Sequence, residues 1–290
     1  MAISETLTLS KNSEPAIFGV SVAIHDDLMV VGAPLDFGES DWAAGRLYVY
    51  RFDGTSWALE TELVAPDGAT GNMLGVSVDT DGERIVAGAW FADVELNDDG
   101  AAYVFLHTPK DGWIFEAKLT AGSPAAGASF GRTVAISGDV IAVGAPYFGS
   151  IEPVSGRVYI FERSNGPWQE IEALDPIGNE PYARFGLGLD FDGSRVAIGA
   201  PFAGNETGTV DIYSGNGGLW THQSHLSGSG NEGHFGFDVA ISGNHLAVGE
   251  YLYGDVGRVH FLEFIDPHWS PNGVFDGDEF GLDAGFGVSV

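Results

Sequence analysis

Four short hydrophobic runs recur in a fixed order along this chain. Large and small side chains alternate over residues 19–24, which is the period of a β-strand with one packed face. The run at 28–31 is continuously apolar, as in a strand buried on both faces. An aromatic-rich run follows at 47–50, and a fourth run starts at Trp57. The pattern therefore predicts four strands in each unit, and we find no helical periodicity.

The unit repeats at a nearly constant interval. A glycine that usually follows a phenylalanine recurs at intervals of 56, 56, 55, 50 and 51 residues, at Gly19, Gly75, Gly131, Gly186, Gly236 and Gly287. A second glycine, in Gly-Ala-Pro or a variant of it, keeps step at Gly32, Gly88, Gly144, Gly199 and Gly249. Periods of this length indicate stacked units, none of which buries its own apolar face alone. We predict an all-β fold, a β-propeller of four-stranded antiparallel blades, and a solenoid is the less suitable alternative.

The phase of the repeat defines the predicted organisation. Five complete blades are expected at about 11–66, 67–122, 123–177, 178–228 and 229–278, with a partial blade at 279–290 and a lone fourth strand at 5–10. Residues 1–290 form one propeller domain in this interpretation, and we expect a segment of a longer ring of six or seven blades. The alternative is a five-bladed ring that is closed by residues 5–10.

Each unit carries a tryptophan six residues before a leucine or phenylalanine. The pairs are Trp57 and Leu63, Trp113 and Leu119, Trp168 and Leu174, Trp220 and Leu226, and Trp269 and Phe275. An even spacing places both residues on one face of a regular strand, so we expect each pair to pack onto the next sheet. A stacking platform for sugar is the alternative role for these tryptophans.

The repeated motif resembles the FG-GAP repeats of integrin alpha subunits and of many bacterial surface and secreted proteins. The residues that carry this resemblance are Phe18-Gly19, Phe130-Gly131, Phe185-Gly186, Phe235-Gly236 and Phe286-Gly287, each except the last followed by Gly-Ala-Pro or a variant. Some units depart from the motif: Leu74 replaces the phenylalanine, and Glu250 replaces the alanine of Gly-Ala-Pro. The resemblance implies a seven-bladed type of propeller with an extracellular or cell-surface role in recognition or adhesion.

Integrin-type repeats often hold calcium between their first and second strands, but the corresponding segments are short here. Residues 79–82 and 190–193 are too short to surround a cation that takes six to eight oxygen ligands. We predict hairpin turns at these positions and no cofactor, and calcium, although possible, is not supported by the turns.

Composition narrows the classes of partner. The chain has 41 acidic and 12 basic residues, a net charge of −29, and no cysteine. This charge repels phosphate backbones, so we expect no nucleic acid partner. No apolar stretch is long enough to span a membrane, and residues 1–7 lack the features of a signal peptide. We expect a protein or glycan ligand, no membrane insertion, and neighbouring domains of a longer chain.

The predicted topology places the long, varied links on one face of the ring. These are the links from second to third strands and from one blade to the next, and such loops commonly carry binding sites. Aromatic residues recur just after the Gly-Ala-Pro position, so our candidate ligand-binding residues are Phe37, Trp42, Trp90, Phe91, Tyr147, Phe148, Phe202, Tyr251 and Tyr253. Trp42 is the preferred single contact. The alternative is that these rings only pack the loop against its own blade.

Metal binding and catalysis have little support in the sequence. Asp93, Glu95, Asn97 and Asp99 alternate as calcium ligands do, but no bidentate glutamate closes the loop, which favours a solvated acidic turn. His222 and His225 are three apart on a predicted strand, on opposite faces, and so make a poor metal pair.

The chain has no nucleophile elbow, zinc-protease motif or phosphate loop. We therefore expect a non-catalytic recognition or adhesion module. A lectin and a structural spacer without a ligand are the alternatives.

Overall fold

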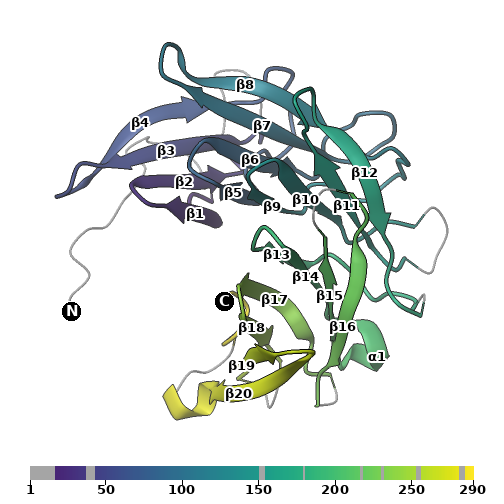
Figure 1. Cartoon of the computed structure of the whole chain (residues 1–290). Helices are drawn as coiled ribbons and strands as arrows, with labels where there is room; N and C mark the ends of the chain where they lie inside the picture. The colour runs from purple at the N-terminus through teal and green to yellow at the C-terminus, as the bar shows by residue number, and fades with distance from the viewer. Residues whose placement is uncertain are drawn as a thin grey trace.

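The structure is a computed structural model, and it describes residues 17–36, 43–149, 154–178, 180–215, 218–229, 232–252, 256–280 and 285–290. Its strands form five sheets of four strands, and each sheet uses strands that follow one another in the chain. All pairs of neighbouring strands are antiparallel. The five sheets are arranged around a common axis as in a propeller, which confirms the predicted fold class (Figure 1).

The strands have the following bounds. The first sheet contains β1 (Ser21–His25), β2 (Leu28–Ala33), β3 (Arg46–Phe52) and β4 (Trp57–Leu63), and the second contains β5 (Val78–Thr80), β6 (Arg84–Ala89), β7 (Ala101–Thr108) and β8 (Gly112–Leu119). The third contains β9 (Thr133–Ser137), β10 (Val140–Ala145), β11 (Arg157–Glu162) and β12 (Gln169–Leu174). The fourth contains β13 (Gly188–Phe191), β14 (Arg195–Ala200), β15 (Thr209–Ser214) and β16 (Thr221–Ser227). The fifth contains β17 (Phe235–Ser242), β18 (His245–Glu250), β19 (Arg258–Ile265) and β20 (His268–Asp276). Two short segments complete the described elements: α1 (Ala203–Glu206), in which Gly204 and Asn205 have left-handed backbone angles, and the 3₁₀ turn η2 (Gly277–Phe280).

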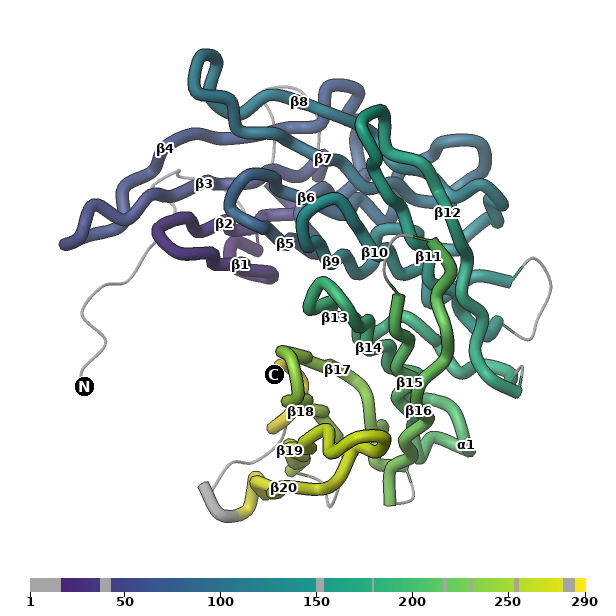
Figure 2. Tube along the Cα trace, in the orientation of Figure 1, coloured from purple at the N-terminus to yellow at the C-terminus, as the bar shows by residue number. Residues whose placement is uncertain are grey.

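The sheets form an arc in which the first strands face the inside. Figures 1 and 2 show β1, β5, β9, β13 and β17 along the inner side, and β4, β8, β12 and β16 along the outer side. The second strand β2 is buried at every residue, as its continuous apolar sequence predicts, and β6 is equally buried although it begins with Arg84. The hydrophobic cores lie between successive sheets, so each sheet depends on its neighbours for burial of its apolar faces.

The two recurring glycines meet across each contact between sheets. A Cβ atom on Gly88 would lie 1.7 Å from the carbonyl oxygen of Gly131, which begins the next unit. At the four other glycines of this position, a Cβ would lie 1.9 to 2.4 Å from the corresponding oxygen. Ser21 and Thr133 add side-chain hydrogen bonds, because their hydroxyls donate to the carbonyls of Gly75 and Gly186. Glycine is therefore required here because backbone touches backbone.

An extra residue interrupts the outermost strand pair of every sheet. In the second sheet, Phe105 pairs with Phe115 and Val104 pairs with Ala117, so Glu116 is a β-bulge. The same register shift occurs in the other four sheets. A bulge changes which residues share a face of the strand.

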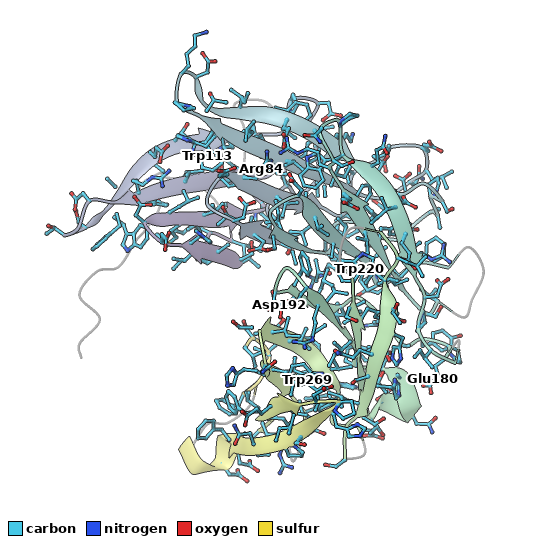
Figure 3. The ribbon with its side chains drawn as sticks, in the orientation of Figure 1. Arg84, Trp113, Glu180, Asp192, Trp220 and Trp269 are labelled. Carbon is cyan, nitrogen blue, oxygen red and sulfur yellow. The ribbon has the colours of Figure 1, made fainter. Side chains whose placement is uncertain are left out.

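The bulge separates each tryptophan from its leucine partner. Trp113 packs between the first and second sheets, whereas Leu119 packs between the second and third. Trp220 and Leu226 divide in the same way. Figure 3 labels Trp113, Trp220 and Trp269, whose rings are packed against the sheet cores. The prediction that each pair shares a face was wrong, because the even spacing counts a residue that the ladder skips.

The bulge residue Glu116 links the second and third sheets. Its carboxylate accepts hydrogen bonds from Arg84 Nε at 3.0 Å, Arg163 Nη1 at 3.0 Å and Trp168 Nε1 at 3.1 Å. Glu60 takes the same position in the first sheet and accepts a bond from Trp113 Nε1 at 3.1 Å. These bonds satisfy the indole N–H groups of Trp113 and Trp168.

The turns between first and second strands are tight hairpins, as predicted. Asp81 Oδ1 accepts bonds from the backbone N–H groups of Glu83 and Arg84. Asp192 Oδ1 makes the same contacts with Ser194 and Arg195. Each aspartate thus stabilises its own turn through bonds to the backbone.

The outward faces of the first and fifth sheets are partly uncovered. Val22 and Ile24 are 50% and 60% exposed, whereas Ile136, which matches Ile24 in the third sheet, is 4% exposed. At the other end of the arc, Phe261 is 37% exposed, whereas the matching Ile160 is 0% exposed.

Of the two terminal segments predicted from the sequence, the structure describes part of the C-terminal one only. The lone strand expected at residues 5–10 lies outside the described residues. Residues 285–290 lie against the fifth sheet, where Phe286 bridges Gly257 and Val290 N donates to Asp238 Oδ2 at 2.9 Å.

Candidate functional site

The long links gather on one face of the arc, which we call the loop face. It contains the β6–β7, β10–β11 and β14–β15 links and the segments that join one sheet to the next. Backbone hydrogen bonds hold these two kinds of link together, for example Tyr147 N to Ala128 O and Phe202 N to Ala183 O. The links therefore lie on one face, as the predicted topology requires. The backbone hydrogen bonds between them hold the recurring aromatic residues in fixed positions.

Trp90, Tyr147 and Phe202 of this series each contact a side chain of the following unit. The Arg132 guanidinium lies 5.0 Å from the Trp90 ring, and Trp90 in turn packs on Phe91 with ring centroids 4.3 Å apart. Burial lowers the pKa of Arg132, and nearby Tyr147 opposes that shift. The rings therefore pack against the following unit as well as against their own loop.

Arg184 lies between two aromatic rings. Its guanidinium is 5.1 Å from the ring of Tyr147 and 4.1 Å from that of Phe202. By contrast, Arg157 also stacks on a ring, that of Phe148, but pairs with a carboxylate. Arg184 has no carboxylate partner among the described residues, although the chain is rich in acidic groups.

The series continues into the fifth sheet. The buried imidazole of His234 packs on Phe202 at 4.5 Å and on Tyr251 at 5.5 Å, and Tyr251 also contacts Phe237 at 4.3 Å. His234 Nε2 lies 3.5 Å from Glu206 Oε2. The second to fifth sheets thus present an alternation of rings and cationic or imidazole groups along one face.

The candidate residues divide into those that the structure describes and those that it does not. Trp90, Phe91, Tyr147, Phe148, Phe202 and Tyr251 are half-buried on the loop face. Phe37, the preferred contact Trp42, and Tyr253 lie outside the described residues. The rings were chosen from the sequence, but their cationic partners were not.

A cavity of about 730 Å³ opens between the third and fourth sheets on the loop face. Its lining includes Tyr147 and Phe202, together with Glu180, Tyr182, Arg184, Asn205 and Glu206, which sequence reasoning missed. Glu180 (labelled in Figure 3) accepts a hydrogen bond from the backbone N–H of Gly204. Arg184 and His234 could have been selected from their positions in the sequence. Each directly precedes a Phe-Gly pair and therefore recurs in phase with the motif.

The comparisons with known proteins agree with this geometry. The FG-GAP repeat family matches at residues 5–50, 57–105 and 113–161. The chain carries FG-GAP repeats. Integrin alpha-4 of Xenopus laevis is 30% identical over 219 residues, and integrin alpha-7 of Rattus norvegicus is 38% identical over 82 residues. These matches cover 68% and 26% of this chain, but only 20% and 7% of the respective integrin subunits.

A solved structure supports the fold of these FG-GAP repeats. A putative 6-phosphogluconolactonase from Bacteroides uniformis superposes with a TM-score of 0.55 over 87% of this chain and 68% of that protein. At 14% identity, this likeness shows the propeller fold alone and carries no lactonase chemistry over to the FG-GAP chain. Among its described helical segments, none is long and apolar enough to cross a membrane.

The acidic loop of the second FG-GAP unit is organised around one carboxylate. Asp99 is 3% exposed, and its oxygens accept bonds from the backbone N–H groups of Val94, Glu95 and Leu96 at 2.8 to 3.0 Å. Asp93 similarly accepts a bond from Asp98 N. Asp99 thus serves as an anionic cap for the loop backbone. Among the described residues, no group of three or more His, Asp or Glu side chains is placed to hold a metal ion.

Replacement of Asp99 by alanine should lower the free energy of unfolding by about 2 kcal/mol, because three backbone N–H groups lose their acceptor. The measurement is chemical denaturation followed by tryptophan fluorescence. Glu95→Ala, an exposed carboxylate of the same loop, is the control and should leave the midpoint unchanged. If both substitutions lower the free energy of unfolding equally, Asp99 does not stabilise the loop as a cap.

The two histidines of β16 lie together, in contrast to the sequence prediction. His222 Nε2 is 2.9 Å and His225 Nδ1 is 2.7 Å from the same oxygen of Asp211, a carboxylate that is 1% exposed. The bulge opposite Ile212 and Tyr213 is the cause, because it inserts a residue between the two histidines in the ladder. The prediction of opposite faces was therefore wrong.

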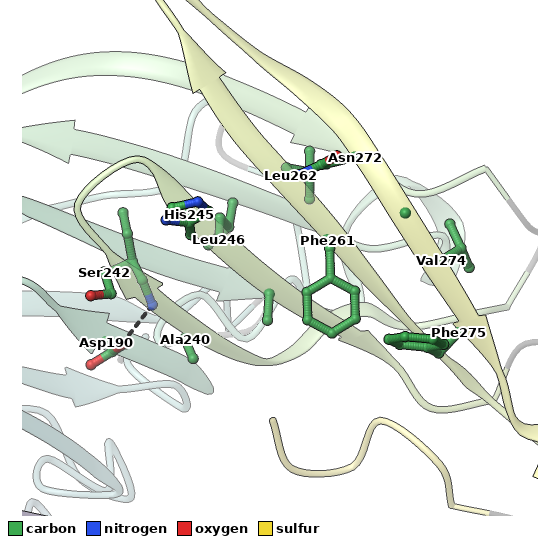
Figure 4. Close-up of a pocket in the computed structure, with 13 residues that line it drawn as sticks. Asp190, Ala240, Ser242, His245, Leu246, Phe261, Leu262, Asn272, Val274 and Phe275 are labelled. Carbon is green, nitrogen blue, oxygen red and sulfur yellow. Dashed lines mark hydrogen bonds between the residues drawn. The ribbon is translucent and has the colours of Figure 1, made fainter.

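The fifth sheet carries an apolar groove of about 630 Å³, shown in Figure 4. Phe261, Val274 and Phe275 lie along it, and the residues that match Phe261 and Phe275 in the third sheet, Ile160 and Leu174, are buried against the fourth sheet. The groove therefore has the character of a sheet-to-sheet contact, and we do not include it in the candidate ligand site.

Proposed function

We propose that this chain is a non-catalytic recognition or adhesion module of the cell surface or extracellular space. In this proposal the loop face holds a protein or glycan ligand. The similarity to integrin alpha subunits supports this class of function.

The observation that carries the proposal is the series of aromatic and cationic side chains across the loop face. It joins Trp90 with Arg132, and Tyr147 with Arg184 and Phe202. Aromatic and arginine side chains dominate the energetics of protein interfaces, because they combine a large apolar area with polar edges. A strand scaffold with buried second strands holds them in fixed positions, which reduces the entropy lost on binding.

A microarray of purified extracellular proteins and purified glycans tests this proposal. We expect the chain to bind at least one ligand of either class, and Arg184→Met to weaken that binding about tenfold. Arg195→Met is the matched control, because Arg195 also stacks on a ring, that of Phe264, but bonds to the turn residue Gly243 away from the loop face. If no ligand on the array is bound, the alternative of a structural spacer is favoured. If Arg184→Met and Arg195→Met weaken binding equally, the loop face is excluded as the binding site.

A further inference from the structure

The cavity between the third and fourth sheets brings an exposed ring together with three planar polar groups. Tyr182 is 53% exposed, and Arg184, Asn205 and Glu206 line the same cavity. The Arg184 guanidinium lies over the rings of Tyr147 and Phe202, and it forms no ion pair with a carboxylate of the described residues. Arginine is a donor, glutamate an acceptor, and asparagine both. The cavity therefore offers complementary hydrogen-bonding groups beside an aromatic surface.

The backbone around this cavity is held in an unfavourable conformation. Tyr182, Asn205 and Glu206 have φ angles of 62°, 58° and 67°, in the left-handed region that side-chain-bearing residues seldom adopt. Arg184, at 53°, shares this conformation with the residue before other Phe-Gly pairs, so its φ belongs to the fold. Tyr182 and Glu206 share theirs with Glu232 and Asp98, which hold the same positions in other units, so only the φ of Asn205 is particular to this cavity. Strained residues of this kind cluster where ligands bind.

We propose that this cavity binds one pyranose unit of a glycan, stacked on Tyr182 and held by Arg184, Asn205 and Glu206. The assignment rests on the proposed function of the loop face and specifies its ligand class. A pyranose has an apolar face that suits an aromatic ring, and its vicinal hydroxyls both donate and accept.

Size and charge favour this ligand class over a peptide. The volume of about 730 Å³ lies in the range of small-molecule pockets and accommodates one or two sugar units. The net charge of −29 does not oppose a neutral sugar. A peptide side chain brings one polar group on an apolar stem, and this leaves most of the surrounding polar groups without partners.

The test is a glycan array of neutral and acidic pyranoses, followed by calorimetric titration with the best free oligosaccharide. We expect Tyr182→Ala to weaken binding at least about tenfold, and Asn205→Gly about fivefold. Asn205→Gly suits its backbone, because glycine accepts the φ of 58°.

Asn165→Gly is the matched control. Asn165 is also exposed with a left-handed φ, of 57°, but it lies in the β11–β12 turn away from the loop face, so its replacement should leave binding unchanged. No binding to any glycan would overturn the proposal. If the chain bound a purified protein and no glycan, and Arg184→Met weakened that binding, the proposed recognition function would stand and the sugar assignment would fail. Sugar binding unaffected by Tyr182→Ala and Asn205→Gly would also overturn this site.

Discussion

Replacement of Gly88 by alanine is expected to lower the free energy of unfolding by about 3 kcal/mol, the upper part of the range for overpacking a buried site. A Cβ at this position would lie 1.7 Å from the carbonyl oxygen of Gly131 and 2.8 Å from its carbonyl carbon. These are backbone atoms of the next sheet, so no rotamer change relieves the clash and the second and third sheets must separate. Chemical denaturation measures the effect.

A control glycine without such a neighbour is available in the same fold. Gly273 of β20 has nothing within 4 Å of a Cβ added to it. Gly273→Ala should be neutral or stabilise the chain by up to about 1 kcal/mol, because it restricts the unfolded chain. If Gly88→Ala and Gly273→Ala unfold at the same denaturant concentration, the close approach of the sheets is not a major determinant of stability.

Acidification from pH 8 to pH 5 is expected to stabilise the fold, with a contribution of about 2 kcal/mol from Asp79. Burial raises the pKa of Asp79 from 3.8 to about 7, against the opposing effect of bonds from the backbone N–H groups of Ile136 and Thr80. Between these two values the folded state binds a proton that the unfolded chain has released, so stability decreases as pH rises. The full shift would give about 4 kcal/mol, and we expect half because the carboxylate is only partly buried.

Two further carboxylates act in the same direction. Burial also raises the pKa of Asp190 and of Asp238, which lie with Asp79 along the inner strands. Denaturation series at several pH values should show a smaller slope in Asp79→Asn. Asp26→Asn, at an exposed turn, should keep the wild-type slope. A wild-type slope in Asp79→Asn would show that Asp79 does not carry the effect.

The sequence predicted the strands well because their patterns depend on local burial. The continuous apolar run at 28–31 and the glycines of the hairpin turns follow from one strand and its immediate partner. The close contact of Gly88 with Gly131 was not predictable. The two glycines are 43 residues apart in the sequence, and their contact depends on how two sheets pack together.

The bulge limited what could be predicted about side-chain faces. Trp113 and Leu119 are six apart, and nothing in that spacing signals that Glu116 is skipped in the ladder. The same limitation affected His222 and His225, which both reach a buried carboxylate. A bulge in one strand is visible only through its partner strand.

The candidate site was predicted in part. The rings of Tyr147 and Phe202 were selected by their phase in the repeat, and they do line a cavity. Tyr182 and Asn205 have no counterpart in the motif, since they come from links of individual length and composition. Their convergence requires two links from successive sheets to meet, which is a property of the assembled ring.

The glycine contact between neighbouring sheets joins main chain to main chain, and among the described residues only Ser21 and Thr133 add a side-chain hydrogen bond to it. Since the main chain is chemically identical in all units, this backbone contact itself requires only the two glycines. Tandem duplication or loss of one whole unit during evolution therefore keeps this contact intact, while the links remain free to diverge toward new specificities.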